Sequence, residues 1–403
     1  MNLRNLPEDL DSSKRCEARR KLIEKTFGVD LSALQIDPTK LGTAEEKNCE
    51  QMFGHVPIPV GLAGPLKIHF SSDETSDVYL PLATTEAALV ASVNRGCKAL
   101  STSGRVKTKS IYHGISRSIA FGFPELDLRG NQEASLLSQI RNRKDDWIAV
   151  GEQTSRHLKI IDWLIDARDN HVFLTIYADT DEAMGMNMVT IAAQAIGEWV
   201  EENLKRHQPI FLTVAGNVDS DKKPSQRTHD KGRGYEVTAE IILPTQVIEE
   251  VLKTTPEKLL RTAHAKLDIG SRVAGAIGSN LQAANVIAAL YLATGQDAAH
   301  VVEGSLADTT VTCASSCPTR VLRVDMRKDA HVTISVRCPA ILVGIRGGGT
   351  GLPAQSQCLE LLQNPSPKEF AEIIAAAVLA GEISLLAAQT THTLAKSHTL
   401  LAR

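Results

Sequence analysis

The stretch "HLKIIDWLIDARDNHVFLTIYAD", residues 157–179, decides how the fold of this chain is interpreted. It contains two runs rich in Ile, Leu, Val and Phe, and the short polar segment "RDN" lies between them. Two β-prone runs joined by a short polar turn predict an antiparallel hairpin.

The segments on either side of the hairpin extend it into a small module. "SIAFGF" (118–123) and "PIFLTVAG" (209–216) are predicted strands, and residues 131–143 and 183–204 are predicted helices. The resulting order is β-α-β-β-α-β, which is the ferredoxin-like pattern of a small α+β module.

The rest of the chain predicts a larger, helix-rich domain into which this module is inserted. A charged amphipathic helix is expected at 13–27. The apolar stretch "IIAAAVLAGEISLLAAQ" near the end is interrupted by Glu382 and is expected to form a buried helix. We therefore expect an α+β fold with four segments. They are an N-terminal helical segment (1–50), the first part of the large domain (51–118), the small domain (119–213) and the second part of the large domain (214–403).

Composition excludes several classes of function. The chain has 403 residues, 43% of them hydrophobic, and a formal net charge of −3 with 4% aromatics, which argues against a nucleic-acid binder. No uninterrupted apolar segment of about 18 residues is present, so we expect no membrane span. The seven cysteines lack the spacing of metal ligands; we expect reduced thiols, no metal and a cytoplasmic location.

The segment "NVDSDKKPSQ" (217–226) concentrates charge directly after the last predicted strand of the small module. Taken alone, it is more often a solvated surface turn ended by Pro224. Charges placed at the end of a buried strand, however, are often directed at a ligand.

Further segments offer chemistry, each with an ordinary structural alternative. Thr180 and Asp181 stand where the cap of the next helix is expected, and a helix N-terminus suits a phosphate or dinucleotide. Thr84 and Thr85 are expected to cap another helix, with Glu86 in its first turn. In isolation, plain helix packing explains both.

Together these segments resemble the family of hydroxymethylglutaryl-coenzyme A reductases, in its class I branch of soluble, prokaryotic type. The resemblance runs from about Cys49 to Arg403. The segments that carry it occur in family order: "KNCEQMFGHVPIPVGLAGPL" (47–66), "ATTEAALVASVNRGC" (83–97), "EAMGMNM" (182–188), "DKKP" (221–224), "GQD" (295–297), "GGGT" (347–350) and "KSH" (396–398).

The resemblance implies a role for each matching residue. The implied catalytic residues are Glu86, Lys222, Asp297 and His398. The implied cofactor-binding residues are Ser155, Arg156, Glu182, Met184, Gly185, Met186, Asn187 and Arg403. The implied substrate-binding residues are Ser92, Asn94, Arg117, Asp221, Lys223, Lys266 and Asn285.

The same resemblance implies reduction of hydroxymethylglutaryl-CoA to mevalonate with two NADPH. The small domain would bind the dinucleotide, and the active site would form between two subunits of a homodimer or larger homo-oligomer. Ser155 and Arg156 would meet the 2′-phosphate of NADPH, whereas the acids Asp181 and Glu182 argue for NADH if they lie near the ribose.

Four positions depart from the family pattern: Ala215 replaces a Ser, Glu182 replaces an Asp, Gln282 replaces a His, and Arg346 precedes the glycines. None is an implied catalytic position. Two alternatives therefore stay open, a reductase of a related branched acyl-CoA and a non-catalytic acyl-CoA or nucleotide-binding homologue.

Overall fold

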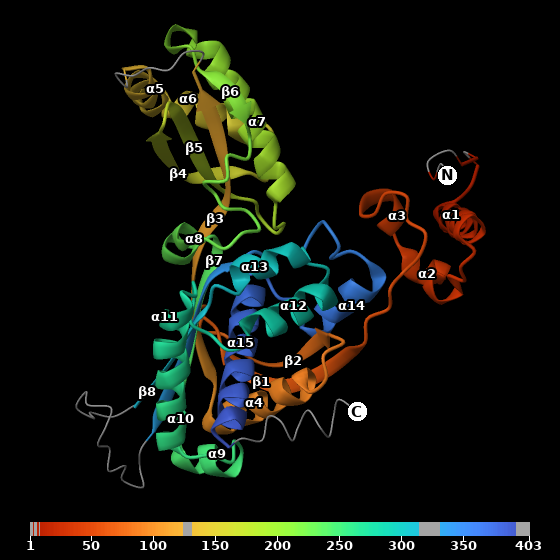
Figure 1. The fold of residues 1–403 in the computed structure, drawn as a ribbon, viewed down its shortest axis with the longest axis vertical. Helices are drawn as coiled ribbons and strands as arrows, with labels where there is room; N and C mark the ends of the chain where they lie inside the picture. The colour runs from red at the N-terminus through yellow and green to blue at the C-terminus, as the bar shows by residue number, and fades with distance from the viewer. Residues whose placement is uncertain (1–2, 4–5, 8, 124–130, 314–330, 392–403) are drawn as a thin grey trace.

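The computed structural model describes residues 3, 6–7, 9–123, 131–313 and 331–391, and it confirms an α+β fold. A small unit stands above a larger one, and a helical arm lies to one side (Figure 1). Each of the three has an apolar cluster of its own.

Nine strands are described: β1 Val60–His69, β2 Thr75–Ala83, β3 Val106–Gly122, β4 Lys159–Arg168, β5 His171–Asp179, β6 Ile210–Thr213, β7 Gly234–Leu243, β8 Asp308–Cys313 and β9 Val332–Ile341. The described α-helices are α1 Ser12–Phe27, α2 Pro38–Leu41, α3 Ala44–Lys47, α4 Leu89–Ser103, α5 Asn131–Asn142, α6 Lys144–Glu152, α7 Met186–Asn203, α8 Gln226–Lys231, α9 Thr245–Glu250, α10 Pro256–Ala263, α11 Ser271–Ala274, α12 Ala283–Thr294, α13 Val301–Gly304, α14 Pro353–Leu361 and α15 Pro367–Thr390. Short 3₁₀ turns are η1 Ser32–Leu34, η2 Lys205–His207 and η4 Ala298–His300, and η3 His264–Gly270 is a π-helical turn.

The small unit has the predicted order of elements with one helix more, because α5 is followed by α6 before β4 begins. Its strands lie in the order β4-β5-β3-β6, and every neighbouring pair is antiparallel. The predicted hairpin is β4 and β5, joined through Asp169 and Asn170, both with positive φ. That conformation suits a tight hairpin turn, and Asn and Asp tolerate it. Apolar residues of β3, β5, α5, α6 and α7 form its core.

The large unit is a sheet in the order β2-β1-β3-β7-β9-β8, packed against α4, α12 and α15. The predicted buried helix near the end is α15. By length and composition it could cross a membrane, but 94% of its most apolar window is buried inside the protein. It is therefore the central core helix of the large unit (Figure 1).

The strand β3 belongs to the sheets of both units. The first part of β3, up to Gly114, pairs with β7, and the part from Ile115 onward pairs with β5. Gly114 lies at the change of partner with φ 80°, a conformation that favours glycine. We propose the small domain at 119–213; its first boundary falls a few residues beyond this change of pairing.

The arm consists of α1, α2 and α3 around a small core of its own. Arg15 and Arg19 of α1 both bind the buried carboxylate of Glu45, at 2.5 and 2.8 Å. The hydrogen bond from Arg15 outweighs burial and lowers the pKa of Glu45 to about 2. Buried ion pairs as well as apolar packing therefore stabilise the arm.

Two expected helix starts are wrong. The helix after Glu86 begins at Leu89, so Glu86 lies in the preceding loop, where its N–H donates to the Thr84 hydroxyl at 2.9 Å. The helix expected to be capped at 180–181 begins at Met186 with Gly185 as N-cap. Thr180 instead bonds the Ala183 carbonyl within a turn. In both places threonine stabilises a loop before the helix.

Candidate active site

The charged segment after β6 folds into a tight loop that presents Lys222. Asn217, Ser220 and Lys222 all have positive φ, at 62°, 54° and 57°. Left-handed backbone in three non-glycine residues costs of order 1–3 kcal/mol each unless the surroundings hold it. The loop ends at α8, which is capped by the Ser225 hydroxyl. It is therefore a built turn rather than a loose surface loop.

The Lys222 ammonium forms an ion pair with Asp297, with 2.7 Å between Nζ and Oδ2. Asp297 follows the end of α12 and also accepts the Ala299 N–H at 3.0 Å. Burial opposes ionisation of this carboxyl, but the bonds from Lys222 and Ala299 prevail and hold the pKa of Asp297 below its usual value. Two of the implied catalytic residues are therefore in direct contact.

Glycines bring the "GQD" and "GGGT" segments together. A Cβ on Gly295 would lie 2.3 Å from the Gly349 carbonyl oxygen, so only glycine permits this approach. The Gln296 side chain then accepts the Gly344 N–H at 3.0 Å. This packing fixes the turn from which Asp297 projects.

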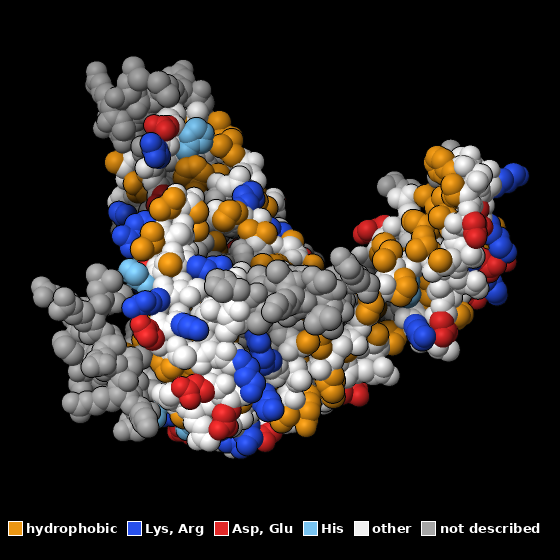
Figure 2. Space-filling view, turned by 60° about the horizontal axis from the view of Figure 1, so that its bottom comes forward, with side chains coloured by type: hydrophobic (Ala, Val, Ile, Leu, Met, Phe, Trp, Pro, Cys, Tyr) orange, Lys and Arg blue, Asp and Glu red, His pale blue; other side chains and the backbone are white. Residues whose placement is uncertain are grey.

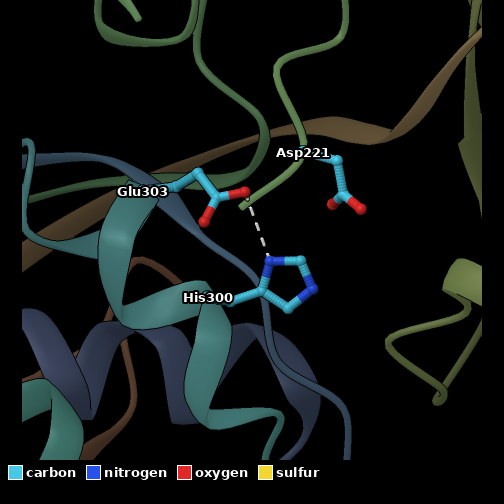
Figure 3. A group of neighbouring side chains, drawn as sticks. All are labelled: Asp221, His300 and Glu303. Carbon is cyan, nitrogen blue, oxygen red and sulfur yellow. Dashed lines mark hydrogen bonds and ion pairs between the residues drawn. The ribbon is translucent and has the colours of Figure 1, made fainter. Parts of the chain in front are cut away.

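A buried polar cluster that we did not predict from the sequence lies beneath the loop. It contains Arg233, Glu303 and His300, at 1%, 0% and 0% exposure, together with Asp221. Arg233 Nη1 lies 2.9 Å from Asp221 Oδ1 and 2.8 Å from Glu303 Oε1. His300 Nδ1 lies 3.3 Å from Glu303 Oε1. Figure 3 marks this interaction with a dashed line.

Asp221, His300 and Glu303 are ligand types that a metal accepts, with ligand atoms within 4.8 Å of one another. Arg233, however, already brings a positive charge to both carboxylates. We expect the guanidinium to serve as the cation here, and the absence of a metal stays a prediction. Burial raises the pKa of Asp221, but Arg233 outweighs it and the pKa stays below its usual value.

Arg117 extends from β3 to the same loop. Its Nη1 lies 3.1 Å from Asp221 Oδ2 and 3.6 Å from Asp219 Oδ2, and its Nε donates to Thr190 of α7 at 2.9 Å. Burial raises the pKa of Asp219. Arg117 thus links the loop to the helix of the small unit, and its implied role toward a substrate carboxylate remains a prediction.

Glu86 lies beside Asn285 of α12, whose side-chain amide donates to Glu86 Oε1 at 3.3 Å. Within the part of the chain that the structure describes, no hydrogen bond or ion pair joins Glu86 to Lys222 or Asp297. Two implied residues are therefore paired here, separately from the Lys222–Asp297 pair. His398 and Arg403 lie outside the described residues.

The implied cofactor residues occupy two neighbouring segments of the small unit. Gly185 has φ 84°, and a Cβ there would lie 2.3 Å from Thr180 Cβ, so the turn before α7 requires glycine. No side chain caps α7, Met186 is buried in the core, Met184 packs against it, and Asn187 is exposed on the first turn. These features leave backbone N–H groups at the helix start free for an anion.

The Ser155 segment lies against the turn before α7. The exposed Arg156 donates to His157 at 3.0 Å, and His157 lies 3.0 Å from Asp181. Ser155 accepts the His157 N–H at 3.2 Å. Glu182 instead forms an ion pair with Arg346, one of the departures from the family pattern. His157 is a further residue that we did not predict from the sequence.

Of the remaining implied substrate residues, all of which the structure describes, Asn94 alone lines one of the two hollows. Asn94 borders a hollow of about 610 Å³ together with Lys67 and Lys98, and its Oδ1 accepts the Gly64 N–H at 3.0 Å. Ser92 instead bonds the buried Ser384 at 3.0 Å. Lys223 Nζ donates to the Asp221 carbonyl at 3.0 Å, and Lys266 is exposed on η3.

The second hollow, of about 590 Å³, begins at Pro224, directly after the loop. Its lining is mostly apolar: Pro224, Gly275, Ile277, Ala284, Val301, Val302, Ser305 and Leu306. Ala284 precedes Asn285 on α12, and Pro224 follows Lys222 by two residues, so the lining is close in sequence to one member of each pair described above. Both hollows are within the size range of small-molecule sites.

This geometry defines a class of enzyme. A cation held on a rigid turn can stabilise an oxyanion, a nearby carboxylic acid can carry a proton, and a glycine-built helix start can accept a dinucleotide phosphate. These are the parts of an oxidoreductase that acts on a carbonyl group.

The comparisons with known proteins identify the family. The family model described as hydroxymethylglutaryl-coenzyme A reductase matches residues 15–403. Curated 3-hydroxy-3-methylglutaryl-coenzyme A reductases of Pyrococcus abyssi and Methanocaldococcus jannaschii are 38% and 39% identical, each over 96% of this chain and 92% of the relative. The Haloferax volcanii enzyme is 36% identical over 100% of the chain and 96% of its own length. The chain belongs to the hydroxymethylglutaryl-coenzyme A reductase family.

Solved structures agree on the fold. The class II reductase of Streptococcus pneumoniae, in a structure described as bound to NADPH in open conformations, gives a TM-score of 0.65 at 18% identity. It covers 94% of this chain and 97% of the solved one. A second structure of the reductase from this organism gives 0.64 at 19% identity.

Proposed function

We propose that the chain reduces hydroxymethylglutaryl-CoA to mevalonate and free CoA, using two NADPH, as a step of isoprenoid synthesis. The observation that carries the proposal is the Lys222–Asp297 pair on the DKKP loop, in a chain that belongs to this family. We further propose a cytoplasmic homodimer, or a larger homo-oligomer, with the site between subunits.

The residues of the small unit fit the dinucleotide. Arg156 offers an exposed guanidinium for the 2′-phosphate, and the start of α7 offers uncapped N–H groups. Glu182 is engaged by Arg346, which lessens its repulsion of a phosphate. Bound NADPH would supply one hydride to each of the two carbonyl reductions.

The chain's own residues stabilise the negative charge that forms on the substrate and donate the protons. Lys222 stabilises the oxyanion formed at the thioester carbonyl, and Asp297 holds Lys222 in place. His398 donates a proton to the CoA thiolate as the hemithioacetal collapses. Glu86, oriented by Asn285, supplies the proton for the second reduction, which converts the aldehyde to the alcohol.

The first test is the decay of NADPH absorbance on addition of hydroxymethylglutaryl-CoA, with two NADPH oxidised for each CoA thiol released. A second acyl-CoA with a shorter branched chain tests the selectivity left open by Ala215. A protein that binds either thioester without oxidising NADPH would be a non-catalytic binder, contrary to the proposal.

The role of His398 is tested by separating the two half-reactions. We expect His398→Gln to slow reduction of the thioester by about 100-fold while reduction of supplied mevaldehyde stays within a few-fold, because only the thioester route releases a thiolate. Equal losses with both substrates would contradict the assignment.

A further inference from the structure

The buried cluster beneath the loop touches Lys222 at its backbone. The Lys222 N–H donates to Glu303 Oε1 at 2.6 Å, and this same oxygen accepts Arg233 Nη1 at 2.8 Å and lies 3.3 Å from His300 Nδ1. Glu303 Oε1 therefore links the loop to two buried residues, Arg233 and His300. The left-handed φ of 57° at Lys222 turns its N–H toward this acceptor.

The buried cluster also lies close to the partner of the Lys222 side chain. His300 Nε2 lies 3.7 Å from Asp297 Oδ2, the atom that binds Lys222 Nζ at 2.7 Å. His300 is fully buried, and its Nε2 has no hydrogen-bond partner among the described residues. Glu303 thus bonds the backbone of Lys222, and His300 lies beside the carboxylate that binds the Lys222 side chain.

We propose that Glu303 and His300 are positioning residues: Glu303 holds Lys222 in its left-handed conformation, and His300 controls the charge on Asp297 through space. The inference rests on the proposed function and adds residues that carry none of its implied roles. Neither residue projects to the hollows, so both act through Lys222 and Asp297.

Several charged or titratable groups surround His300 and enter any pH dependence. Asp297, Glu303 and Asp221 lie next to His300. Lys222, Arg233 and Tyr291 act on those carboxylates, since Lys222 and Arg233 bond them and Tyr291 interacts electrostatically with Glu303 and Asp297. Burial raises the pKa values of Asp221 and Asp297, and a positive charge at His300 is among the causes that lower them. Removing it lets Asp297 take up a proton at a higher pH.

Glu303 is tested with two variants that separate its charge from its reach. Glu303→Gln keeps the shape and removes the charge, whereas Glu303→Asp keeps the charge for Arg233 but falls one methylene short of the Lys222 N–H. We expect each variant to lower kcat for hydroxymethylglutaryl-CoA by about tenfold or more. The KM values for hydroxymethylglutaryl-CoA and for NADPH should stay within about twofold of those of the wild type. The matched control is Glu372→Gln, which removes another buried carboxylate that is bonded to Ser71, Thr108 and Ser110.

Amide hydrogen exchange of residues 217–226 supplies a readout that needs no activity. We expect exchange there to be about fivefold faster in Glu303→Asp than in the wild type and in Glu372→Gln. Unchanged kcat in Glu303→Asp, or unchanged exchange of this segment, would overturn the role of Glu303. A wild type without turnover would instead refute the proposed function, and the exchange measurement would still decide the role of Glu303.

His300 is tested with His300→Gln, against His113→Gln as a control, since His113 is a half-buried histidine paired with Glu236 at 2.7 Å. We expect the acid limb of the kcat–pH profile to move to higher pH by about half a unit or more in His300→Gln only. A limb that stays in place, or that moves to lower pH, would show that His300 does not act on Asp297.

Discussion

At the scale of single residues, Lys222 shows how a strained backbone serves a charged side chain. Its positive φ directs the N–H into the protein and the ammonium toward Asp297. A flexible lysine on a surface loop would lose rotamer entropy each time it met an oxyanion. The fixed turn removes that cost before the substrate arrives.

The corresponding prediction concerns Lys222→Ala. We expect kcat to fall by at least ~100-fold while KM for hydroxymethylglutaryl-CoA changes little, because Lys222 acts on charge that develops only in the transition state. Steady-state kinetics and isothermal titration with the substrate measure the two effects. A variant with near-wild-type kcat would remove Lys222 from this role.

A second residue-scale prediction concerns the nicotinamide cofactor. We expect kcat/KM to favour NADPH over NADH in the wild type by more than about tenfold, and Arg156→Ala to erase most of that preference. Arg168→Ala, at an exposed site at the end of β4, is the control. The assignment fails if the wild type prefers NADH or if Arg156→Ala behaves as the wild type does with NADPH.

At the scale of elements, sequence patterns predicted the kind of element better than its first residue. The hairpin, the ferredoxin-like order and the buried α15 were predictable. The spacing of apolar residues along a helix or strand indicates which of its faces packs against the core. The starts of α4 and α7 were not, since Thr84 and Thr180 bond within the preceding turns. Residues that suit a cap suit a turn equally well.

The site was predictable only in part, for a related reason. The strand end before "DKKP" indicated a charged segment directed at a ligand, and family resemblance indicated Lys222 and Asp297. Glu303 and Arg233 gave no comparable signal, because their importance arises from contacts across 70 or more positions, such as Arg233 to Glu303. His300 lies three residues from both Asp297 and Glu303, but its complete burial beside them is not visible in the sequence. Glu303 in the apolar run "HVVEGSL" was the available hint, since a lone acid there has to find a buried partner.

The element-scale prediction concerns the packing of α4 on α15. A Cβ on Gly96 would lie 1.9 Å from the Ala380 carbonyl oxygen, so the two helices touch backbone to backbone. We expect Gly96→Ala to reduce the free energy of unfolding by about 3 kcal/mol or more, measured by urea denaturation. Gly28→Ala, where nothing lies within 4 Å, should lose about 1 kcal/mol from strain alone. Equal losses would mean that α4 and α15 can separate without cost.

At the scale of the whole molecule, the arm and its connection leave apolar surface uncovered. Hydrophobic side chains gather on the side of the arm that faces the body, and charged ones line its outer edge (Figure 2). Val56, Ile58, Val60 and Leu62 alternate along the connecting segment at 77%, 39%, 56% and 54% exposure. Several exposed apolar side chains close together in the sequence are typical of a protein–protein contact.

We therefore predict that Val56→Asp combined with Ile58→Asp shifts the protein toward monomers and lowers activity with it. Sedimentation velocity across a concentration series measures the first effect, and the NADPH assay measures the second. Ile191→Asp, an exposed apolar position on α7, is the control for sedimentation. A wild type that sediments as a monomer would refute the proposed homo-oligomer.

The continuous strand β3 has a consequence for how this protein can be re-engineered. An inserted unit that is connected through loops can be transplanted by cutting at those loops. Here the entrance to the small unit is a strand interior, where Gly114 separates pairing with Gly234 from pairing with Ala178. A graft of a foreign cofactor-binding unit must therefore be spliced inside the sheet, in register with β7 and β5, or the chimera will lose alignment between hydride donor and carbonyl.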